Sequence, residues 1–427
     1  MNHSGRVSAR PERREALGLA TLFAAIYFIQ GIGEPTEGLI AQPVRSLLAS
    51  WGHSASEIAA FSALLSIPWV LKPLYGLLSD FVPIAGSHRR YYLIVTSAAT
   101  SLGLAYLYLN PPQPGSYHWL LVMLMVPTVG VAFSDVVADA LMVEKGQPRG
   151  MTGQLQSIQW TALYAATIVT GFLGGYLSQH GQQTLAFLIC AVFTAGTAIL
   201  AIFLVRETTR ANSSHEARAA WAALERTFRT PAVWSVAVFL FLWNFNPFST
   251  SVLYLHMTRS MGLSEQFYGN TVSILAVAAV AASIAYYFYC RRVRFELLIH
   301  LSIAAGVAST LAYWGLSGPV SAVWITLLVG FTYMTGTLIQ LDLAARICPP
   351  ETAGTTLALL MAVSNLGYSL SVALGGSLYE GWMETRGEVG AFDMLVRVGA
   401  LSTCACWLVV PWLRRQDQFA ENSADKD

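Results

Sequence analysis

Twelve apolar runs, each long enough to cross a bilayer as a helix, make up most of this 427-residue chain. Charged residues are 11% of the sequence and hydrophobic residues 55%, whereas a soluble domain carries about 25% charged residues. So few charges cannot cover the surface of a soluble protein of this length. We therefore expect an all-α polytopic membrane protein with twelve transmembrane helices, at about residues 17–42, 57–78, 91–109, 119–143, 153–177, 184–205, 231–256, 266–290, 296–315, 319–343, 353–379 and 392–413.

The basic residues are distributed unevenly between the loops. Twelve spans place both termini and every second loop on one side of the membrane. Of the 25 Lys and Arg residues, 20 fall on that side and three on the other. Because Lys and Arg accumulate in cytoplasmic loops, we expect both termini in the cytoplasm of a protein of the inner or plasma membrane.

The longest connection is polar and basic and separates two groups of six runs. It predicts a basic cytoplasmic tail (1–16), an N-terminal six-helix half (17–206), a cytoplasmic loop (207–230), a C-terminal six-helix half (231–413) and a second cytoplasmic tail (414–427). In the fifth run of each half, a glycine is followed 21 residues later by a Gly-Gly pair, at Gly153 with Gly174-Gly175 and at Gly354 with Gly375-Gly376. Duplicated halves around a midplane site are the architecture of secondary transporters.

Ionisable side chains in hydrocarbon are costly, so each one inside a run is a functional candidate. The first run holds Glu34 and Glu37 in the segment GIGEPTEG. Three residues apart, they would share a helix face, with Pro35 loosening the backbone between them. They are either a protonatable pair facing a cavity, as proton coupling requires, or solvated acids at the outer end of the helix; the sequence leaves both interpretations open.

Three acids, Asp135, Asp139 and Glu144, lie toward the cytoplasmic end of the fourth run, in AFSDVVADALMVEKG. Asp135 and Asp139 are four residues apart and share a helix face. Their depth favours an inner gate or a structural charge network over direct coupling. Asp342 is their counterpart in the second half. Arg149 and Arg346, in the loops that follow, are candidate cationic partners.

The second run contains Lys72, with Pro68 and Pro73 on either side of it to kink the helix. Asp80 follows on the next cytoplasmic turn, and Arg89 and Arg90 come shortly after it. We interpret these charges as gate residues and not as ligands.

The seventh run is interrupted by Asn244, Asn246 and Pro247. A broken helix within the membrane is tolerated beside a cavity or inside protein. The neighbouring aromatic rings would suit stacking on a heterocyclic solute, although packing explains any single ring slightly better.

The chain shows no sign of enzyme chemistry. It contains no GxxxxGK[ST] motif, no HExxH motif and no nucleophile–base pattern, which argues against an ATP-driven pump or an enzyme and predicts neither a cofactor nor a metal site. A net charge of +1 gives no reason to expect nucleic acid.

Three segments carry a resemblance: KPLYGLLSDFVPIAGSHRRYY, AFSDVVADALMVEKG and TGQLQSIQW resemble the folate–biopterin transporter family of the major facilitator superfamily. The resemblance covers about residues 60–180, and the second half is similar to the superfamily in layout. It implies a twelve-helix transporter of folates or pterins, coupled to protons, with charged signature positions at Lys72, Asp80, Asp135, Asp139 and Glu144. The superfamily's first, fourth, seventh and tenth helices line its cavity, which would place there Glu34, Asp135, Asn244, Asn246, Tyr333 and Gln340.

The sequence also departs from these patterns. GIGEPTEG is more acidic than expected for the family's first helix, and Phe81 follows Asp80 where the superfamily has a basic residue.

We therefore expect a monomeric, proton-coupled secondary transporter whose partners are a small organic solute, protons and the lipid bilayer. Folate or a pterin is the first solute to consider. The alternatives are a permease for a muropeptide, a siderophore or an acyl-CoA-like solute, or a membrane receptor or assembly factor that does not transport.

Overall fold

The computed structural model describes residues 9–149, 151–207, 222, 225, 229–289, 292–347 and 353–415, which are mostly helical and contain no β-strand. The first part of the chain forms α1 (Ala9–Gly33), α2 (Ala41–Ser50), α3 (Ala55–Leu65), α4 (Ile67–Val70), α5 (Lys72–Phe81), α6 (Arg90–Leu109), α7 (Tyr117–Gly146), η1 (Gln147–Arg149), α8 (Thr152–Gln179) and α9 (Gln183–Phe203). The second part forms α11 (Pro231–Asn244), α12 (Thr250–Leu255), the π-helical turn η2 (His256–Ser260), α13 (Glu265–Tyr289), α14 (Phe295–Ala312), η3 (Tyr313–Gly315), α15 (Pro319–Ile347), α16 (Ala353–Cys404) and α17 (Cys406–Arg415).

Ten helices of the described residues are long and apolar enough to cross a membrane. The longest of these stretches, Thr356–Arg415, contains the expected eleventh and twelfth spans, because the helix is interrupted at Gly387, where φ is 70°. The expected seventh span is divided between α11 and α12. The helices are therefore those of an all-α polytopic membrane protein and are consistent with twelve spans. Most of the predicted central loop 207–230 and of the two tails lies outside the described residues.

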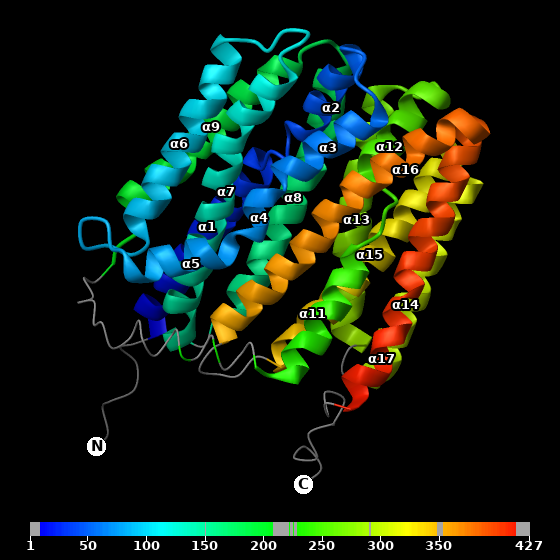
Figure 1. The fold of residues 1–427 in the computed structure, drawn as a ribbon. Helices are drawn as coiled ribbons and strands as arrows, with labels where there is room; N and C mark the ends of the chain where they lie inside the picture. The colour runs from blue at the N-terminus through cyan, green and yellow to red at the C-terminus, as the bar shows by residue number, and fades with distance from the viewer. Residues whose placement is uncertain are drawn as a thin grey trace, which may run out of the picture.

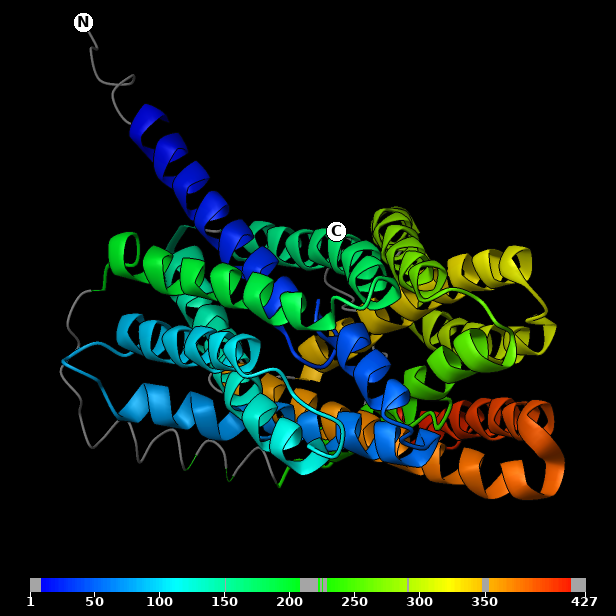
Figure 2. The ribbon, with the colours of Figure 1, turned by 90° about the horizontal axis from the view of Figure 1, so that it is seen from above.

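The helices form two groups that stand side by side (Figures 1 and 2). Helices α1–α9 form one group, here called the first half, and α11–α17 form the second half. The start of α1 and the end of α17 lie toward the same side of the bundle (Figure 1), which we call the terminal face. The other side, which we call the opposite face, carries α2, α3 and α12.

The helix breaks predicted from proline and asparagine are present. The second span is interrupted at Ser66 and at Leu71, and each break is followed two residues later by a proline, Pro68 or Pro73. A proline near a helix start is tolerated because its missing N–H would have no helical partner there. In the seventh span, α11 ends at Asn244 and helical geometry resumes at Thr250.

The duplicated glycine pairs lie at equivalent places in the two halves. A Cβ atom on Gly175 would lie 3.0 Å from the Cα of Gly269 on α13, and one on Gly376 would lie 2.3 Å from the Cβ of Ala59 on α3. Each pair therefore lets a helix of one half approach a helix of the other half closely. Small residues serve this purpose between membrane helices in general.

Hydrogen bonds join the two halves at the opposite face. The backbone oxygen of Glu265 accepts from Gln42 Nε2 at 2.7 Å, and its carboxylate accepts from Ser46 Oγ at 2.9 Å. The carboxylate of Glu380 accepts from Ser54 Oγ at 2.8 Å. Two acids of the second half thus accept hydrogen bonds from donors of the first half, and these bonds hold the two halves together at the opposite face.

The tight helix contact yields a prediction. A Cβ atom on Gly269 would lie 2.3 Å from the backbone oxygen of Gly171, and backbone cannot move aside as a side chain can. Gly269→Leu should therefore force α8 and α13 apart and lower the free energy of unfolding by about 1–3 kcal/mol, the usual cost of overpacking. Thermal unfolding of the purified protein measures this. Gly18→Leu is the matched control, because nothing lies within 4 Å of a Cβ atom there; an equal effect of both substitutions would contradict the account.

Candidate functional site

A buried ion pair lies between α5 and α7. Lys72 is the first residue of α5, and its ammonium lies 2.5 Å from Asp135 Oδ2 and 4.6 Å from the centre of the Trp69 ring. Asp135 is 5% exposed and also accepts a hydrogen bond from Gln30 Nε2. The sequence suggested Arg149 and Arg346 as cationic partners for the acids Asp135, Asp139 and Asp342. For Asp135 that prediction is wrong, because its partner is Lys72.

Asp139 lies one helical turn along α7 from Asp135 and has different partners. Its Oδ1 accepts a hydrogen bond from the Tyr27 hydroxyl at 2.6 Å and another from Gln159 Nε2 at 2.9 Å. Lys72 lies within electrostatic range of both acids but contacts Asp135 directly. Three helices of the first half, α1, α5 and α8, thus supply the groups that surround the acidic face of α7.

These charges do not balance. The group contains one cation, Lys72, and two carboxylates, Asp135 and Asp139, in the interior of a membrane protein. An unpaired charge is strongly disfavoured there. The group nevertheless carries one more carboxylate than cation among its side chains.

Glu34 and Glu37 do not share a helix face, so that prediction is wrong. Helix α1 ends at Gly33, and a turn follows instead of another helical turn. Glu34 is 9% exposed and folds back on this turn, where it accepts hydrogen bonds from the Thr36 hydroxyl, from Thr36 N at 2.9 Å and from Glu37 N at 2.5 Å. Glu37, by contrast, is exposed.

The turn is fixed by close packing. Gly31 and Gly33 lie against Ala166 and Thr194, so that a Cβ atom at either glycine would approach a side chain to within 2.7 Å or less. The N–H of Leu39 then donates to the oxygen of Ile32 at 3.0 Å, across the turn. The acidic segment is thereby held as a rigid loop with one carboxylate inside and one outside.

Tyrosines from both halves surround Glu37. Tyr368 of α16 interacts with its carboxylate, and Tyr164 of α8 and Tyr333 of α15 lie within electrostatic range of it. Tyr333 is near the middle of α15 and is 52% exposed. Because Tyr333 lies within electrostatic range of Glu37, Tyr164 and Tyr368, which come from both halves, we take this exposed surface to face the space between the halves.

The polar residues of the seventh and tenth helices lie mostly inside the second half. Asn244 Nδ2 donates to Gln340 Oε1 at 3.2 Å, and Gln340 is 7% exposed. Asn246 Oδ1 accepts from Phe248 N at 3.0 Å and closes the break between α11 and α12, while its amide nitrogen donates to Thr310 Oγ1 at 3.2 Å. The Phe248 ring packs on Tyr313, at 4.5 Å between ring centres, so the packing interpretation of these rings holds for it.

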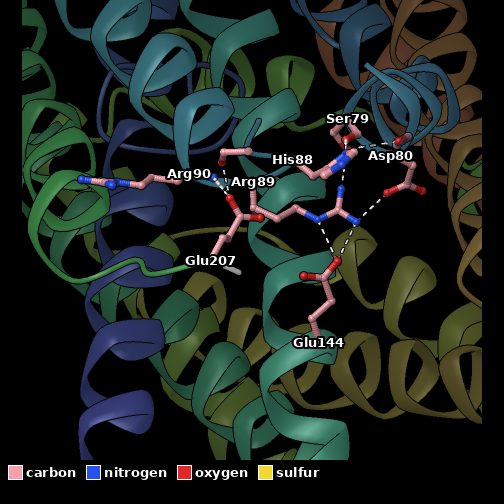
Figure 3. A network of polar contacts seen from close by, with 9 residues as sticks. Ser79, Asp80, His88, Arg89, Arg90, Glu144 and Glu207 are labelled. Atoms are coloured by element: carbon pink, nitrogen blue, oxygen red, sulfur yellow. Dashed lines mark hydrogen bonds and ion pairs between the residues drawn. The ribbon is translucent and has the colours of Figure 1, made fainter. Parts of the chain in front are cut away.

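A second polar network lies at the terminal face and joins three of the predicted gate residues (Figure 3). The Arg89 guanidinium lies 2.5 Å from Asp80 Oδ1 and 2.9 Å from Glu144 Oε1, and its Nη1 donates to Ser79 Oγ at 2.7 Å. Arg89 is 7% exposed, whereas both acids reach solvent. This arginine therefore ties the end of α5 to the end of α7.

Arg90 and Glu207 form the other part of Figure 3. The guanidinium of Arg90 donates to the backbone oxygen of Ile202 at 2.6 Å, at the end of α9, where a cation also interacts favourably with the helix dipole. Glu207, which the sequence did not single out, accepts from Arg90 N at 3.0 Å and from the Ser87 hydroxyl. Burial opposes the charge of Glu207, but these hydrogen bonds favour it and lower its pKa overall.

Three predicted gate charges form local pairs. Arg149 pairs with Glu15 at the start of α1, and Arg346 pairs with Asp342 at 3.2 Å one turn away on α15. Asp342 is therefore not surrounded by a buried network as Asp139 is. Within the part of the chain that the structure describes, no three His, Cys, Asp or Glu residues are placed to hold a metal ion.

Several functional candidates escaped the sequence patterns. Tyr27, Gln30 and Gln159 hold the acids of α7, and Tyr164 and Tyr368 lie beside Glu37. The spacing of Tyr27 and Gln30, three residues apart on the first helix, was the available signal, since such residues share a face. Uncharged tyrosines in apolar helices carry no comparable signal.

Residues 36–427 match the family model of the BT1 family. The chain belongs to the BT1 family. It is 28% identical over 421 residues to a folate–biopterin transporter of Synechocystis, covering 91% of this chain and 80% of that protein. It is 23% identical over 442 residues to probable folate–biopterin transporter 4 of Arabidopsis thaliana, covering 86% and 89%.

Solved structures show which fold this BT1-family chain adopts. A D-xylose–proton symporter superposes with a TM-score of 0.72 at 14% identity, covering 93% of this chain and 98% of the other. The nucleoside transporter NupG superposes with a TM-score of 0.68 at 14% identity, covering 94% and 98%. The fold is therefore that of the major facilitator superfamily, and the family is one of transporters and not of enzymes.

The Arg89 network yields a prediction for stability. Arg89→Ala would remove the cation and leave Asp80 and Glu144 without their shared partner, so we expect the free energy of unfolding to fall by about 1–3 kcal/mol. Arg89→Lys should recover only part of the loss, because an ammonium lacks the forked geometry of a guanidinium. Thermal unfolding measures both. The exposed Arg386 is the control position. If Arg89→Ala lowered the stability no more than Arg386→Ala does, the role of the network would be contradicted.

Glu207 yields a prediction for pH dependence. A carboxylate whose pKa is lower in the folded protein stabilises the fold above its unfolded pKa, about 4.3, and loses this effect as the pH falls through the folded value. Glu207→Gln should therefore lower the unfolding midpoint at pH 7. Its difference from the natural protein should shrink as the pH falls below about 4. A difference that stays constant between pH 7 and pH 3 would show that the charge of Glu207 is not what stabilises the terminal face.

Proposed function

We propose that this protein is a secondary active transporter that moves a folate or an unconjugated pterin across a membrane by alternating access, coupled to protons. The observation that carries the proposal is the place of Glu37 and Tyr333. Both are exposed, and they interact with tyrosines of the two halves, which are joined at the opposite face. A solute would reach the space between the halves from the terminal face.

The relatives support the choice of solute. Proteins named as folate–biopterin transporters align with nearly the whole of this chain, and a folate transporter of Plasmodium falciparum aligns with 76% of it at 22% identity. The pteridine ring shared by folate and biopterin is flat, aromatic and rich in hydrogen-bonding groups. It matches a space bordered by a carboxylate and by tyrosines.

Transport requires the two halves to exchange their contacts. The moving units are residues 17–206 and 231–413, connected by the loop 207–230. In the alternate state, the hydrogen bonds of Glu265 and Glu380 to the first half would break and the terminal face would close. The Arg89 network keeps the terminal ends of α5 and α7 together so that they move as one body.

We assign the binding of the transported proton to the group formed by Lys72, Asp135 and Asp139. Its excess of one carboxylate favours a bound proton, and Asp139 is the acid that does not contact the ammonium directly. Glu34 is set aside as the proton carrier, because three hydrogen bonds from its own turn already hold its carboxylate.

The orientation follows from the distribution of basic residues. The terminal face holds the side with 20 of the 25 Lys and Arg residues, so both termini lie in the cytoplasm of an inner or plasma membrane. In this orientation, the hydrogen bonds that join the halves at the opposite face lie on the outer side of the membrane. A single chain contains both halves of the site, so a monomer suffices for transport.

Uptake into proteoliposomes tests the function. The purified protein should accumulate radiolabelled pterin or folate inside vesicles when a proton gradient is imposed, and accumulation should stop when an ionophore removes the gradient. Empty liposomes are the control. A folded protein that moves no pterin and no folate under either condition would exclude this function and favour a receptor or a permease for another solute.

The proton group makes a separate prediction. Asp139→Asn leaves Lys72 paired with Asp135 alone, so the remaining charges balance without a proton. We expect this variant to exchange solute across the membrane at a rate near that of the natural protein but to lose gradient-driven accumulation. Asp342→Asn, at the corresponding place in the second half, is the matched control and should keep both activities. Gradient-driven accumulation by Asp139→Asn would place the coupling proton elsewhere.

A further inference from the structure

Glu37 is an exposed carboxylate that interacts with the Tyr368 hydroxyl and can still accept hydrogen bonds from a ligand. Its backbone is fixed by Glu34, whose Oε2 accepts the Glu37 N–H at 2.5 Å, yet its side chain is exposed. Within the described residues it forms no ion pair. The neighbouring cation Arg45 is 8% exposed and donates to the Thr36 oxygen at 3.4 Å, and Lys72 is taken by Asp135.

The groups around Glu37 come from both halves and are aromatic. Tyr368 packs with Ala59 and Ala63 of α3, so its ring lies on the boundary between the halves. Tyr164 reaches Met334 of α15 and stacks on Trp160 of its own helix, at 6.1 Å between ring centres. A flat solute here would meet one carboxylate, several hydroxyl groups and the faces of rings.

The chemistry of a free carboxylate determines which edge of a flat solute it prefers. Its two oxygens accept two parallel hydrogen bonds, as they do from a guanidinium. A pterin presents such a pair of donors side by side, the ring N3–H and the 2-amino group. An otherwise similar ring with an oxo group in place of the amino group presents an acceptor there, which a carboxylate repels.

We propose that Glu37 binds the N3–H and 2-amino edge of the pteridine ring, with Tyr333 and Tyr368 beside the ring, and that this contact sets solute selectivity. The proposal rests on the transport function above. Glu34 and Asp135, which the family resemblance would place along the cavity, do not suit this contact, since both side chains are buried and already hydrogen-bonded. The proposal also gives a role to the acidic segment GIGEPTEG.

The test compares two ligands that differ at one position, pterin and lumazine, which carries an oxo group where pterin has its 2-amino group. Pterin should bind the purified natural protein at least about tenfold more tightly, since a lost charge-assisted hydrogen bond has about this effect. Equal binding of the two ligands by the natural protein would overturn the proposal, and this comparison requires no variant to fold.

Variants then assign the selectivity to one residue. Glu37→Gln should reduce the ratio of pterin to lumazine binding to near one, because an amide can both donate and accept. Glu37→Asp should retain part of the preference. Glu384→Gln is the control, since Glu384 is an exposed acid about four helical turns along α16 from Tyr368. A folded Glu37→Gln protein with the natural ratio would overturn the role of Glu37.

The outcomes for transport and for selectivity are distinguishable. A natural protein that transports neither ligand would remove the proposed function. A natural protein that transports pterin, with a preference over lumazine that Glu37→Gln does not change, would leave the function in place and remove the assignment of Glu37.

Discussion

The ion pair between Lys72 and Asp135 is the constraint on which the rest of the site depends. A lysine in hydrocarbon must be paired, and its partner comes from another helix, 2.5 Å away. Asp139, on the next turn of α7, then has no cation of its own and is held by the neutral groups Tyr27 and Gln159. Burial and incomplete pairing together give this group a reason to bind and release a proton.

The acids of the first helix divide the remaining tasks. The carboxylate of Glu34 accepts hydrogen bonds from the turn after α1 and so fixes its shape. Glu37, on the same turn, is exposed between the halves. One buried carboxylate thus positions one exposed carboxylate. The proposed proton group and the proposed solute site are separate, yet both involve the first helix, since α1 carries Tyr27 and Gln30 and leads into Glu37.

Much of the fold was predictable because hydrophobic length and helix-breaking residues act locally. The runs around Pro68 and Pro73 and around Asn246 gave helices broken where expected. The site was predictable only as a set of charged residues. The partner of Lys72 depends on which helices meet, and the end of α1 at Gly33 depends on contacts of Gly31 and Gly33 with Ala166 and Thr194, which no local pattern reveals. For the same reason Glu34 and Glu37 were expected on one face, and Tyr164 and Tyr368 were overlooked.

The most direct test of this account is whether protons move with the solute. Vesicles that contain the purified protein and an internal pH indicator receive pterin on one side, with no gradient imposed and an ionophore present to remove the membrane potential. The account predicts that the interior acidifies as pterin enters, at a constant ratio of protons to pterin, and that Asp139→Asn abolishes the acidification while pterin still equilibrates. Entry of pterin through the natural protein with no change of internal pH would contradict it.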